Sequence, residues 1–256
     1  MWTDRYTPLR IVFRGTLLTL LIVIGTIPVV LCINRVGNSI RVGNRQLDEF
    51  MLRIWTLAMC RIFSVRVRVK GVIEPAPTLI VSNHISWLDI IALHTAAPMG
   101  FVSKAEVATW PLVGTLARKS NTVFHERGKH DSSSNVTAAM TKRLKDGQRV
   151  AIFPEGGIKP GDHVKVFHAR LFAAAVEVAC PVQPVMIRYV RNGRRDPDMT
   201  FMANERFVGN IFRLLGRPAC VCDIRFLEAV QAQGRPRREL AESAQAAVSA
   251  VFEEQL

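Results

Sequence analysis

An uncharged apolar run marks the first part of the chain, because residues 15–33 are 19 positions without one charged side chain. About 20 apolar residues suffice to cross the hydrocarbon core of a bilayer. No small-residue cleavage site follows the run, so the sequence predicts a retained membrane anchor rather than a signal peptide. Arginines flank both ends and give no clear orientation, and Gly25 with Pro28 allows a kink. A full span and a monotopic hairpin therefore both stay open.

A second helical pattern follows the apolar run. Residues 46–63 carry apolar side chains at helical spacing, interrupted by Arg53 and Arg61. This pattern suits either an interfacial amphipathic helix or an ordinary helix packed on a core, and the sequence favours neither. Apolar and basic residues then alternate strictly over 65–70, which is typical of a strand with one solvated face. We therefore expect a membrane anchor and interfacial helix over residues 1–63 and a globular domain over residues 64–256.

Short apolar strands alternate with helical segments over the rest of the chain. Strands are predicted at residues 78–82, 122–124, 149–153, 181–187 and 219–226, and the longer helices at 164–179 and 236–254. The arginine-rich segment 189–198 is predicted as a charged loop. Strands that alternate with helices favour an α/β fold. We expect a central, mainly parallel or mixed sheet flanked by helices, with a helical membrane-associated element at the N-terminus.

The charge balance narrows the class of partner. Lys and Arg number 34 against 21 Asp and Glu, a net charge of +13, and the first 70 residues alone carry 11 basic and three acidic side chains. Anionic membrane lipids attract such a surface, as do phosphate-bearing ligands or an acidic carrier protein. Nucleic acid is disfavoured as a partner, since no recognition motif is present and only 7% of residues are aromatic.

The polar turn after the 78–82 strand carries the first candidate for chemistry. His84 and Asp89 lie five residues apart where a strand gives way to a helix, so their side chains meet only if His84 stands in the turn before the helix. A carboxylate that accepts one ring N–H fixes the tautomer of an imidazole and orients it as a general base. A surface histidine beside a helix-turn acid is the other interpretation, and the segment 83–89 alone does not decide between them.

Two further strand ends present polar groups. Glu155 and Gly156 follow the 149–153 strand in a tight turn whose glycines permit the close approach of a ligand. Arg127 follows another strand, and a guanidinium suits bidentate contacts to a phosphate or carboxylate. The strand at 181–187 is bracketed by prolines and suits the wall of a pocket lined by acyl chains.

Four blocks within residues 78–188 resemble, in order and spacing, the glycerolipid acyltransferase superfamily, most closely its bacterial 1-acyl-sn-glycerol-3-phosphate acyltransferases. The blocks are N-H-x4-D at 83–89, F-x-x-R at 124–127, F-P-E-G at 153–156 and V-x-P-V at 182–185. Each block alone is a weak signal, whereas four in fixed order are specific. The resemblance implies a membrane-bound O-acyltransferase whose catalytic domain occupies residues 64–256.

The resemblance also implies a role for each matching residue. The catalytic residues would be His84 and Asp89, and the substrate-binding residues Lys104, Arg127, Glu155 and Gly156. His84 would be the general base that activates the acceptor hydroxyl, and Asp89 would hold its ring. Arg127 and Lys104 would bind the anionic head of the acceptor, with a solvated surface lysine as the alternative for Lys104. Glu155 would bind the acceptor or hold the phosphate-binding loop.

One position departs from the family pattern. Many members follow F-P-E-G with Thr-Arg-Ser, whereas this chain has Gly157-Ile158-Lys159, so an expected hydroxyl and guanidinium are absent. Either Lys159 or Lys165 supplies compensating charge, or the acceptor carries a different head group. Related enzymes that acylate lyso-ornithine lipid resemble the chain almost as well.

The expected reaction moves a fatty acyl group from an acyl thioester to the free hydroxyl of lysophosphatidic acid, giving phosphatidic acid in phospholipid biosynthesis. Lyso-ornithine lipid is the alternative acceptor. An inactive membrane-surface binding protein is the alternative of another class, and the intact His84 and Asp89 argue against it. Acyl-CoA and acyl-carrier protein both stay open as donors, and no cofactor or metal is expected because the thioester supplies its own leaving group.

The five cysteines add a constraint on compartment. They are scattered, with neither a C-x-x-C pair nor a histidine cluster, so the sequence predicts no zinc site and favours a reduced environment. Membrane lipids are the expected partners, and the cytoplasmic face of a bacterial inner membrane is the expected location.

Overall fold

The computed structural model of the chain describes residues 6–125, 132–158 and 162–254, and its main feature is one large mixed sheet. The strands of that sheet are β3 (Val65–Lys70), β4 (Thr78–Ser82), β5 (Gly100–Lys104), β6 (Val123–His125), β7 (Arg149–Ile152), β8 (Pro181–Arg191), β9 (Arg194–Arg195), β10 (Cys220–Phe226) and β11 (Val230–Gln231). Their order is β3-β10-β8-β4-β7-β5-β6, with β9 and β11 both paired to β8. A separate hairpin joins β1 (Arg41–Val42) and β2 (Arg45–Gln46).

Most of this sheet is parallel. Strands β8, β4, β7, β5 and β6 run in one direction, whereas β10 pairs antiparallel to β8 and brings β3 with it in the reverse direction. The carboxyl ends of β4, β7 and β5 therefore meet at one edge of the sheet, and their amino ends meet at the opposite edge. The predicted α/β fold with a mainly parallel or mixed sheet is confirmed.

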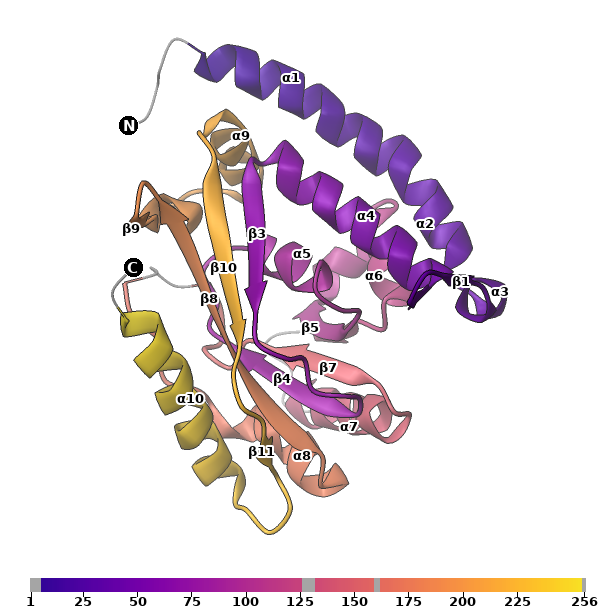
Figure 1. Cartoon of the computed structure of the whole chain (residues 1–256), viewed down its shortest axis with the longest axis vertical. Coiled ribbons are helices and arrows are strands. Elements are labelled where there is room, and N and C mark those ends of the chain that lie inside the picture. The colour runs from indigo at the N-terminus through magenta and orange to yellow at the C-terminus, as the bar shows by residue number, and fades with distance from the viewer. Residues whose placement is uncertain (1–5, 126–131, 159–161, 255–256) are drawn as a thin grey trace.

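Helices cover both faces of the sheet (Figure 1). They are α4 (Leu47–Ile62), α5 (Leu88–His94), α6 (Val113–Lys119), α7 (Ser132–Lys145), α8 (Ala173–Val178), α9 (Phe207–Gly216) and α10 (Arg237–Glu253), with 3-10 turns η2 (Ala105–Thr109), η3 (Ala169–Phe172) and η4 (Pro197–Met199). The connections β4 to β5 and β6 to β7 step across the sheet in opposite directions. Because parallel crossovers are right-handed, α5 and α7 lie on opposite faces.

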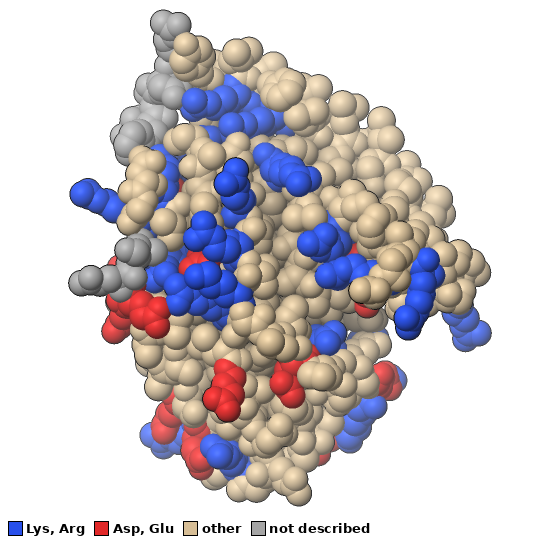
Figure 2. Space-filling view, viewed as in Figure 1, with Lys and Arg blue, Asp and Glu red and all other residues tan. Residues whose placement is uncertain are grey.

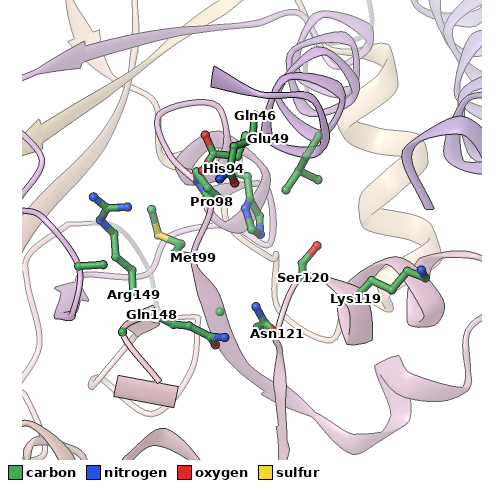
Figure 3. A pocket seen from close by; sticks show the side chains of 14 residues that line it. Gln46, Glu49, His94, Pro98, Met99, Lys119, Ser120, Asn121, Gln148 and Arg149 are labelled. Carbon is green, nitrogen blue, oxygen red and sulfur yellow. The ribbon is translucent and has the colours of Figure 1, made fainter. Parts of the chain in front are cut away.

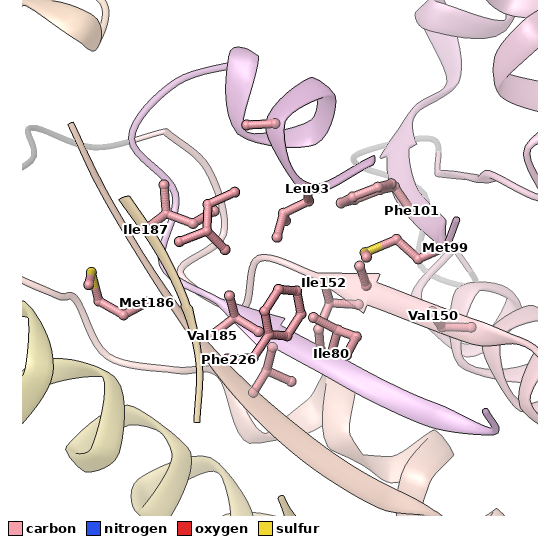
Figure 4. Close-up of a cluster of buried hydrophobic side chains, with 14 of the residues drawn as sticks. Ile80, Leu93, Met99, Phe101, Val150, Ile152, Val185, Met186, Ile187 and Phe226 are labelled. Atoms are coloured by element: carbon pink, nitrogen blue, oxygen red, sulfur yellow. The ribbon is translucent and has the colours of Figure 1, made fainter. Parts of the chain in front are cut away.

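The apolar core lies between the sheet and these helices. All five positions of β4 are buried, as expected for a central parallel strand. Figure 4 shows part of this core, where Ile80 of β4 and Ile152 of β7 lie near Leu93 of α5. Phe101 and Val185 complete the cluster, and none of the five side chains is more than 1% exposed. This packing fixes the strand ends that carry the polar residues.

The N-terminal element is one continuous helix. It consists of α1 (Thr7–Leu20), a π-helical turn η1 (Leu21–Gly25) and α2 (Thr26–Cys32), and a short helix α3 (Arg35–Ser39) follows it. The π-turn precedes Pro28, whose ring cannot fit against the carbonyl of Ile24 in a regular α-helix. Trp55 of α4 donates its indole N–H to the Thr26 hydroxyl at 3.2 Å and so anchors α2 on α4. In the described part of the chain, residues 7–32 form the one helix long and apolar enough to cross a membrane.

This helix lies along the domain (Figure 1). One side packs on α4 and α9, and the Arg14 guanidinium donates to the carbonyls of Leu215 at 2.8 Å and Arg217 at 2.7 Å, where α9 ends. The other side exposes a row of apolar residues, which we call the apolar stripe: Leu9, Val12, Phe13, Leu17, Leu20, Val23, Ile24, Ile27 and Leu31. An exposed apolar surface of this extent is typical of a face that contacts a membrane or a partner.

Basic side chains gather on part of the surface (Figure 2). In that view they lie over β3 and β10 and below the N-terminal half of α1. Strand β3 is an edge strand that exposes Arg66, Arg68 and Lys70. Positive charge on an edge strand also discourages pairing with a second chain. On this face of the molecule the basic residues are therefore concentrated over β3 and β10.

The helix predicted over 164–179 is wrong in its first part. Residues 164–168 are irregular, and helical structure begins only with η3 and α8. The backbone N–H of His168 donates to the Pro154 carbonyl at 2.9 Å, and that of Lys165 donates to the Glu155 carboxylate at 2.8 Å. Contacts to the F-P-E-G turn thus override the local helical pattern.

Two further predictions can be compared with the structure. The charged loop predicted at 189–198 is wrong, since β8 continues to Arg191 and pairs with β9. The segment 46–63 is helical as predicted, and one face of α4 packs on the core through Leu52, Trp55 and Met59, whereas an interfacial role for its other face stays a prediction. Strand β5 and helices α6, α7 and α9 were not predicted, although the apolar positions of α9 recur at helical spacing.

Candidate active site

The candidate site lies at the carboxyl edge of the sheet, where β4 and β7 end side by side. Asn83 directly follows β4, and its side-chain amide exchanges two hydrogen bonds of 2.8 Å with the backbone of Ile187 in β8. These bonds continue the strand pairing after β4 itself has ended. The backbone is thereby free to turn at His84 while the position of the turn stays fixed.

His84 and Asp89 meet as their spacing allows. His84 stands in the turn before α5, and Asp89 lies in the first turn of that helix. The His84 Nδ1 is 2.9 Å from the Asp89 Oδ2, which also accepts the backbone N–H groups of Ile85 at 2.7 Å and Ser86 at 2.9 Å. Asp89 is completely buried. Acidic residues in a first helical turn are also favoured by the helix dipole.

Tyr189 completes the environment of Asp89. Its hydroxyl donates to the second carboxylate oxygen, Oδ1, at 2.8 Å, and its side chain is buried in β8. Burial, reinforced by the charge of Asp89, raises the pKa of the Tyr189 phenol well above its usual value, so the phenol remains a donor. No motif in the sequence points to Tyr189. Its alternation with Val185 and Ile187 along β8 predicts its face of the sheet but not its partner.

The ring of His84 is oriented from two sides. It stacks on Phe153, the first residue of the F-P-E-G block, with ring centroids 3.9 Å apart and planes 11° from parallel. Its side chain is 11% exposed. With the Nδ1 proton donated to Asp89, Nε2 carries the lone pair and can accept a proton from a bound molecule.

Glu155 connects the two strand ends through backbone contacts. Its Oε2 accepts the N–H of His84 at 2.7 Å, and its Oε1 accepts the N–H of Lys165 at 2.8 Å. Burial raises the pKa of the carboxyl group, and the two amide hydrogen bonds act against that shift. Gly156 follows with a φ of +77°, a conformation that disfavours any side chain. The geometry matches the loop-holding interpretation of Glu155.

The described basic residues of this edge are less closely associated with His84 than Asp89 and Glu155 are. Lys104 ends β5 on the same edge of the sheet, two strands from His84, and its side chain is exposed. The ammonium group of Lys165 lies 3.8 Å from the Asp162 carboxylate, which offsets its charge. Arg127 and Lys159 lie outside the described residues, so their predicted roles stay predictions.

The described residues contain no group of three or more His, Cys, Asp or Glu side chains that could hold a metal ion. The described site presents an oriented imidazole, a buried carboxylate and a turn that connects the two strand ends.

Comparisons with known proteins identify the family. The family model described as Acyltransferase matches residues 64–188. The lyso-ornithine lipid O-acyltransferase of Pseudomonas aeruginosa is 40% identical over 202 residues, which cover 79% of this chain and 78% of that protein. This chain belongs to the acyltransferase family. The resemblance predicted from the four sequence blocks is therefore confirmed, and the protein is an acyltransferase enzyme.

Two further acyltransferases resemble the chain. The 1-acyl-sn-glycerol-3-phosphate acyltransferase of Neisseria gonorrhoeae is 34% identical over 116 residues, covering 45% of this chain and 46% of that protein. The crystal structure of the 1-acyl-sn-glycerophosphate acyltransferase PlsC from Thermotoga maritima superposes with a TM-score of 0.72, covering 96% and 95% of the two chains. Its sequence identity is 22%, so this likeness shows a shared fold. Together with the apolar N-terminal helix, family membership makes this acyltransferase a membrane-associated protein of lipid metabolism.

Proposed function

We propose that this acyltransferase moves a fatty acyl group from an acyl thioester to the free hydroxyl of lyso-ornithine lipid. The hydrogen-bonded pair of His84 and Asp89 supports the transfer chemistry, because it presents one unprotonated ring nitrogen at the edge of the sheet. The 40% identity to the Pseudomonas aeruginosa lyso-ornithine lipid O-acyltransferase over most of both chains supports the choice of acceptor.

The proposed reaction needs one base and one leaving group. His84 Nε2 removes the proton of the acceptor hydroxyl while the oxygen attacks the thioester carbonyl carbon. Asp89 stabilises the imidazolium that forms and keeps the ring in one tautomer. The tetrahedral intermediate then collapses, the carbon–sulfur bond breaks, and the imidazolium returns its proton to the thiolate. Tyr189 and the amides of Ile85 and Ser86 hold Asp89 in place throughout.

The turn after F-P-E-G also supports a head group without phosphate. Gly157-Ile158-Lys159 replaces the Thr-Arg-Ser of many family members. The replacement removes one hydroxyl and one guanidinium, both of which suit a phosphate ligand. Lyso-ornithine lipid is zwitterionic and offers no phosphate for such groups. Lys104, which is exposed at the end of β5, would then bind a carboxylate of the head group.

Lysophosphatidic acid is the second candidate acceptor. It is favoured by the 34% identity to the Neisseria gonorrhoeae 1-acyl-sn-glycerol-3-phosphate acyltransferase and by Arg127, which occupies the family position in F-x-x-R. An inactive binding protein, by contrast, would not need the four hydrogen bonds that hold Asp89 against His84.

The N-terminal helix is proposed to lie in the membrane interface rather than to span the bilayer. One side of the helix is occupied by α4 and α9, and the apolar stripe faces outward along its whole length. A helix that uses one side for protein and the other for lipid suits a monotopic attachment. We place the enzyme on the cytoplasmic face of a bacterial inner membrane, where either acyl-CoA or acyl-carrier protein can deliver the acyl group.

Competition between the two acceptors tests the proposal. The purified full-length enzyme receives lyso-ornithine lipid and lysophosphatidic acid together in mixed micelles, with acyl-CoA or acyl-carrier protein as donor. We expect kcat/KM for lyso-ornithine lipid to be at least about tenfold higher, a difference of about 1.4 kcal/mol in transition-state binding. A preference for lysophosphatidic acid with both donors would contradict the proposed acceptor but not the acyltransferase chemistry.

A charge substitution adds a second readout. Lys104→Ala should raise the KM for the acceptor and leave the donor KM unchanged. Lys70→Ala is the matched control, since Lys70 is exposed at the end of the edge strand β3, three strands from β4 and on the other side of it from β5. Equal acceptor KM values in both variants would show that Lys104 does not contact the head group.

A further inference from the structure

A polar cavity lies at the amino edge of the sheet. Its volume is about 300 Å³, and it is bordered by the amino ends of β5 and β7, the start of α4 and the ends of α5 and α6 (Figure 3). We call it the amino-edge pocket. The five residues of β4 separate the two edges by roughly 16 Å at about 3.3 Å per residue. The pocket is therefore not an extension of the site around His84.

Three residues of the amino-edge pocket bury polar atoms that find no hydrogen-bond partner within the described residues. These atoms are His94 Nδ1, Ser120 Oγ and Gln148 Oε1. His94 is only 8% exposed, and Figure 3 shows the three side chains around one common space. Buried polar atoms are nearly always paired, and an unpaired one destabilises the folded state. Three in one cavity indicate a place for a polar ligand.

The other buried polar atoms without a partner in the described residues have a different setting. There are six in all, and the remaining three belong to Arg188, Arg217 and Asp223. Each of those side chains makes ion pairs through its other atoms. Within the described residues, the side chains of His94, Ser120 and Gln148 make no hydrogen bond to another protein group that could compensate. The amino-edge pocket thus gathers three side chains whose buried polar atoms lack a partner in the described part of the chain.

The pocket is also positively charged. Arg149 and Lys119 line it, and each donates one hydrogen bond to a backbone carbonyl, of Glu74 at 3.0 Å and of Ile33 at 2.9 Å. Glu49 is its acidic lining residue and stabilises the charge of Arg149. Two cations against one carboxylate leave a net positive charge. The terminal guanidinium nitrogens of Arg149 retain donors suited to a carboxylate or phosphate.

The side chains of the amino-edge pocket that lack hydrogen-bond partners suit a ligand with hydroxyl groups. Burial lowers the pKa of His94 to about 4, so its ring is neutral at physiological pH and can donate one hydrogen bond and accept another. The Ser120 hydroxyl and the Gln148 amide also donate and accept. A ligand hydroxyl is the natural partner of such groups, because it too has both capacities.

From the cavity, its unpartnered polar atoms and its net charge, we propose that the amino-edge pocket binds a small hydroxylated anion. His94, Ser120 and Gln148 bind its hydroxyl groups, and Arg149 binds its anionic group, a phosphate monoester or a carboxylate. A volume near 300 Å³ is at the lower limit of small-molecule sites, which restricts the ligand to a compact one. This site does not rest on the proposed acyl acceptor.

Calorimetric titration of the purified full-length protein tests the proposal with four probes. Glycerol 2-phosphate and glycerate both combine an anionic group with hydroxyls, whereas inorganic phosphate lacks the carbon-bound hydroxyls and glycerol lacks the charge. We expect one saturable site for at least one hydroxylated anion, at least tenfold tighter than for phosphate or glycerol, and a Tm that rises with its concentration. The preferred anion identifies the charged group. Absence of saturable binding for both hydroxylated anions at millimolar concentration would overturn the proposal.

Substitutions locate the binding. Ser120→Ala and Gln148→Leu should weaken the affinity for the bound probe at least tenfold, yet leave the Tm of the ligand-free protein unchanged or higher, because each removes an unpaired buried group. Arg149→Met should abolish binding, with Arg238→Met as matched control, since Arg238 is exposed on α10 and pairs with Glu242 of the same helix. Retained acyl transfer shows that each variant is folded. If Arg149→Met fails to fold, Ser120→Ala decides, and wild-type probe affinity in that variant would exclude the pocket as the site.

Discussion

Buried polar groups at the two edges of the sheet differ in whether they have hydrogen-bond partners. At the carboxyl edge, Asp89 is completely buried and accepts four hydrogen bonds, and Glu155 accepts two more. At the amino edge, three side chains bury polar atoms that have no partner in the described residues. The seven-residue helix α5 joins the two edges, with Asp89 in its first turn and His94 at its last position.

The difference separates two kinds of polar site. A network completed within the protein fixes the position and tautomer of a reactive group before any substrate binds, which is the arrangement that general-base catalysis requires. A set of groups left without partners keeps its hydrogen bonds for a ligand and lowers the stability of the folded protein until the ligand binds. Substitutions at each edge should therefore affect different properties.

Breaking the hydrogen-bond network between Asp89 and His84 should have the largest effect, a loss of kcat. Asp89→Asn retains a side chain of the same size but cannot stabilise an imidazolium at His84, so kcat should fall by about 10²- to 10⁴-fold. Steady-state kinetics of acyl transfer measure this loss. Asp223→Asn is the matched control, because Asp223 is also buried, yet its ion pairs with Arg188 and Arg225 lie in β8 and β10. Comparable kcat losses in the two variants would reduce Asp89 to a structural role.

Protonation of His94 in the amino-edge pocket should have the next largest effect, a loss of stability. Burial lowers the pKa of His94 from 6.5 to about 4. Between these two pH values the unfolded chain therefore binds a proton at His94 and the folded protein does not. The free energy of unfolding is therefore not reduced by His94 above pH 6.5, where the ring is neutral in both states. It falls by roughly 3 kcal/mol as the pH drops from 6.5 to about 4. Denaturant unfolding of the wild type and of His94→Gln at pH 7 and pH 4 measures it. An equal loss in both proteins would show that His94 is not the responsible group.

Removing the hydrogen bond that Tyr189 donates to Asp89 should have a smaller effect on kcat. Tyr189→Phe leaves Asp89 Oδ1 without its donor but preserves the packing of the ring. We expect kcat to fall about tenfold with an unchanged acceptor KM, since one hydrogen bond to a charged group contributes about 1.5–3 kcal/mol. A loss of stability without any change in kcat would mean that Tyr189 supports the fold alone.

The sequence allows much of the carboxyl edge to be predicted, because its groups follow strand ends directly. His84 and Asp89 are five residues apart, and Glu155 follows a strand that pairs with β4. Tyr189 could not be predicted, because it lies 100 residues from Asp89 and their contact depends on the parallel pairing of β4 with β8. Local patterns contain no information about that pairing.

The amino-edge pocket was not predictable for the same reason. His94, Ser120 and Gln148 come from the end of α5, the end of α6 and the turn before β7, and none belongs to a motif. Their proximity follows from the strand order, which places β7 between β4 and β5 although it comes later in the chain. The irregular segment 164–168 shows the same limit, since distant contacts to Pro154 and Glu155 override its helical pattern.

Turnover of lyso-ornithine lipid by the wild type and by His84→Ala tests the central claim most directly. Mass spectrometry of the lipid products from purified full-length proteins, with equal vesicle binding and circular dichroism as controls, measures the acylated product. The wild type should form the diacylated lipid, and His84→Ala should form it about 10²- to 10⁴-fold more slowly, because only the proton acceptor has been removed. Near-wild-type turnover by folded, vesicle-bound His84→Ala would contradict the assignment of His84 as the base.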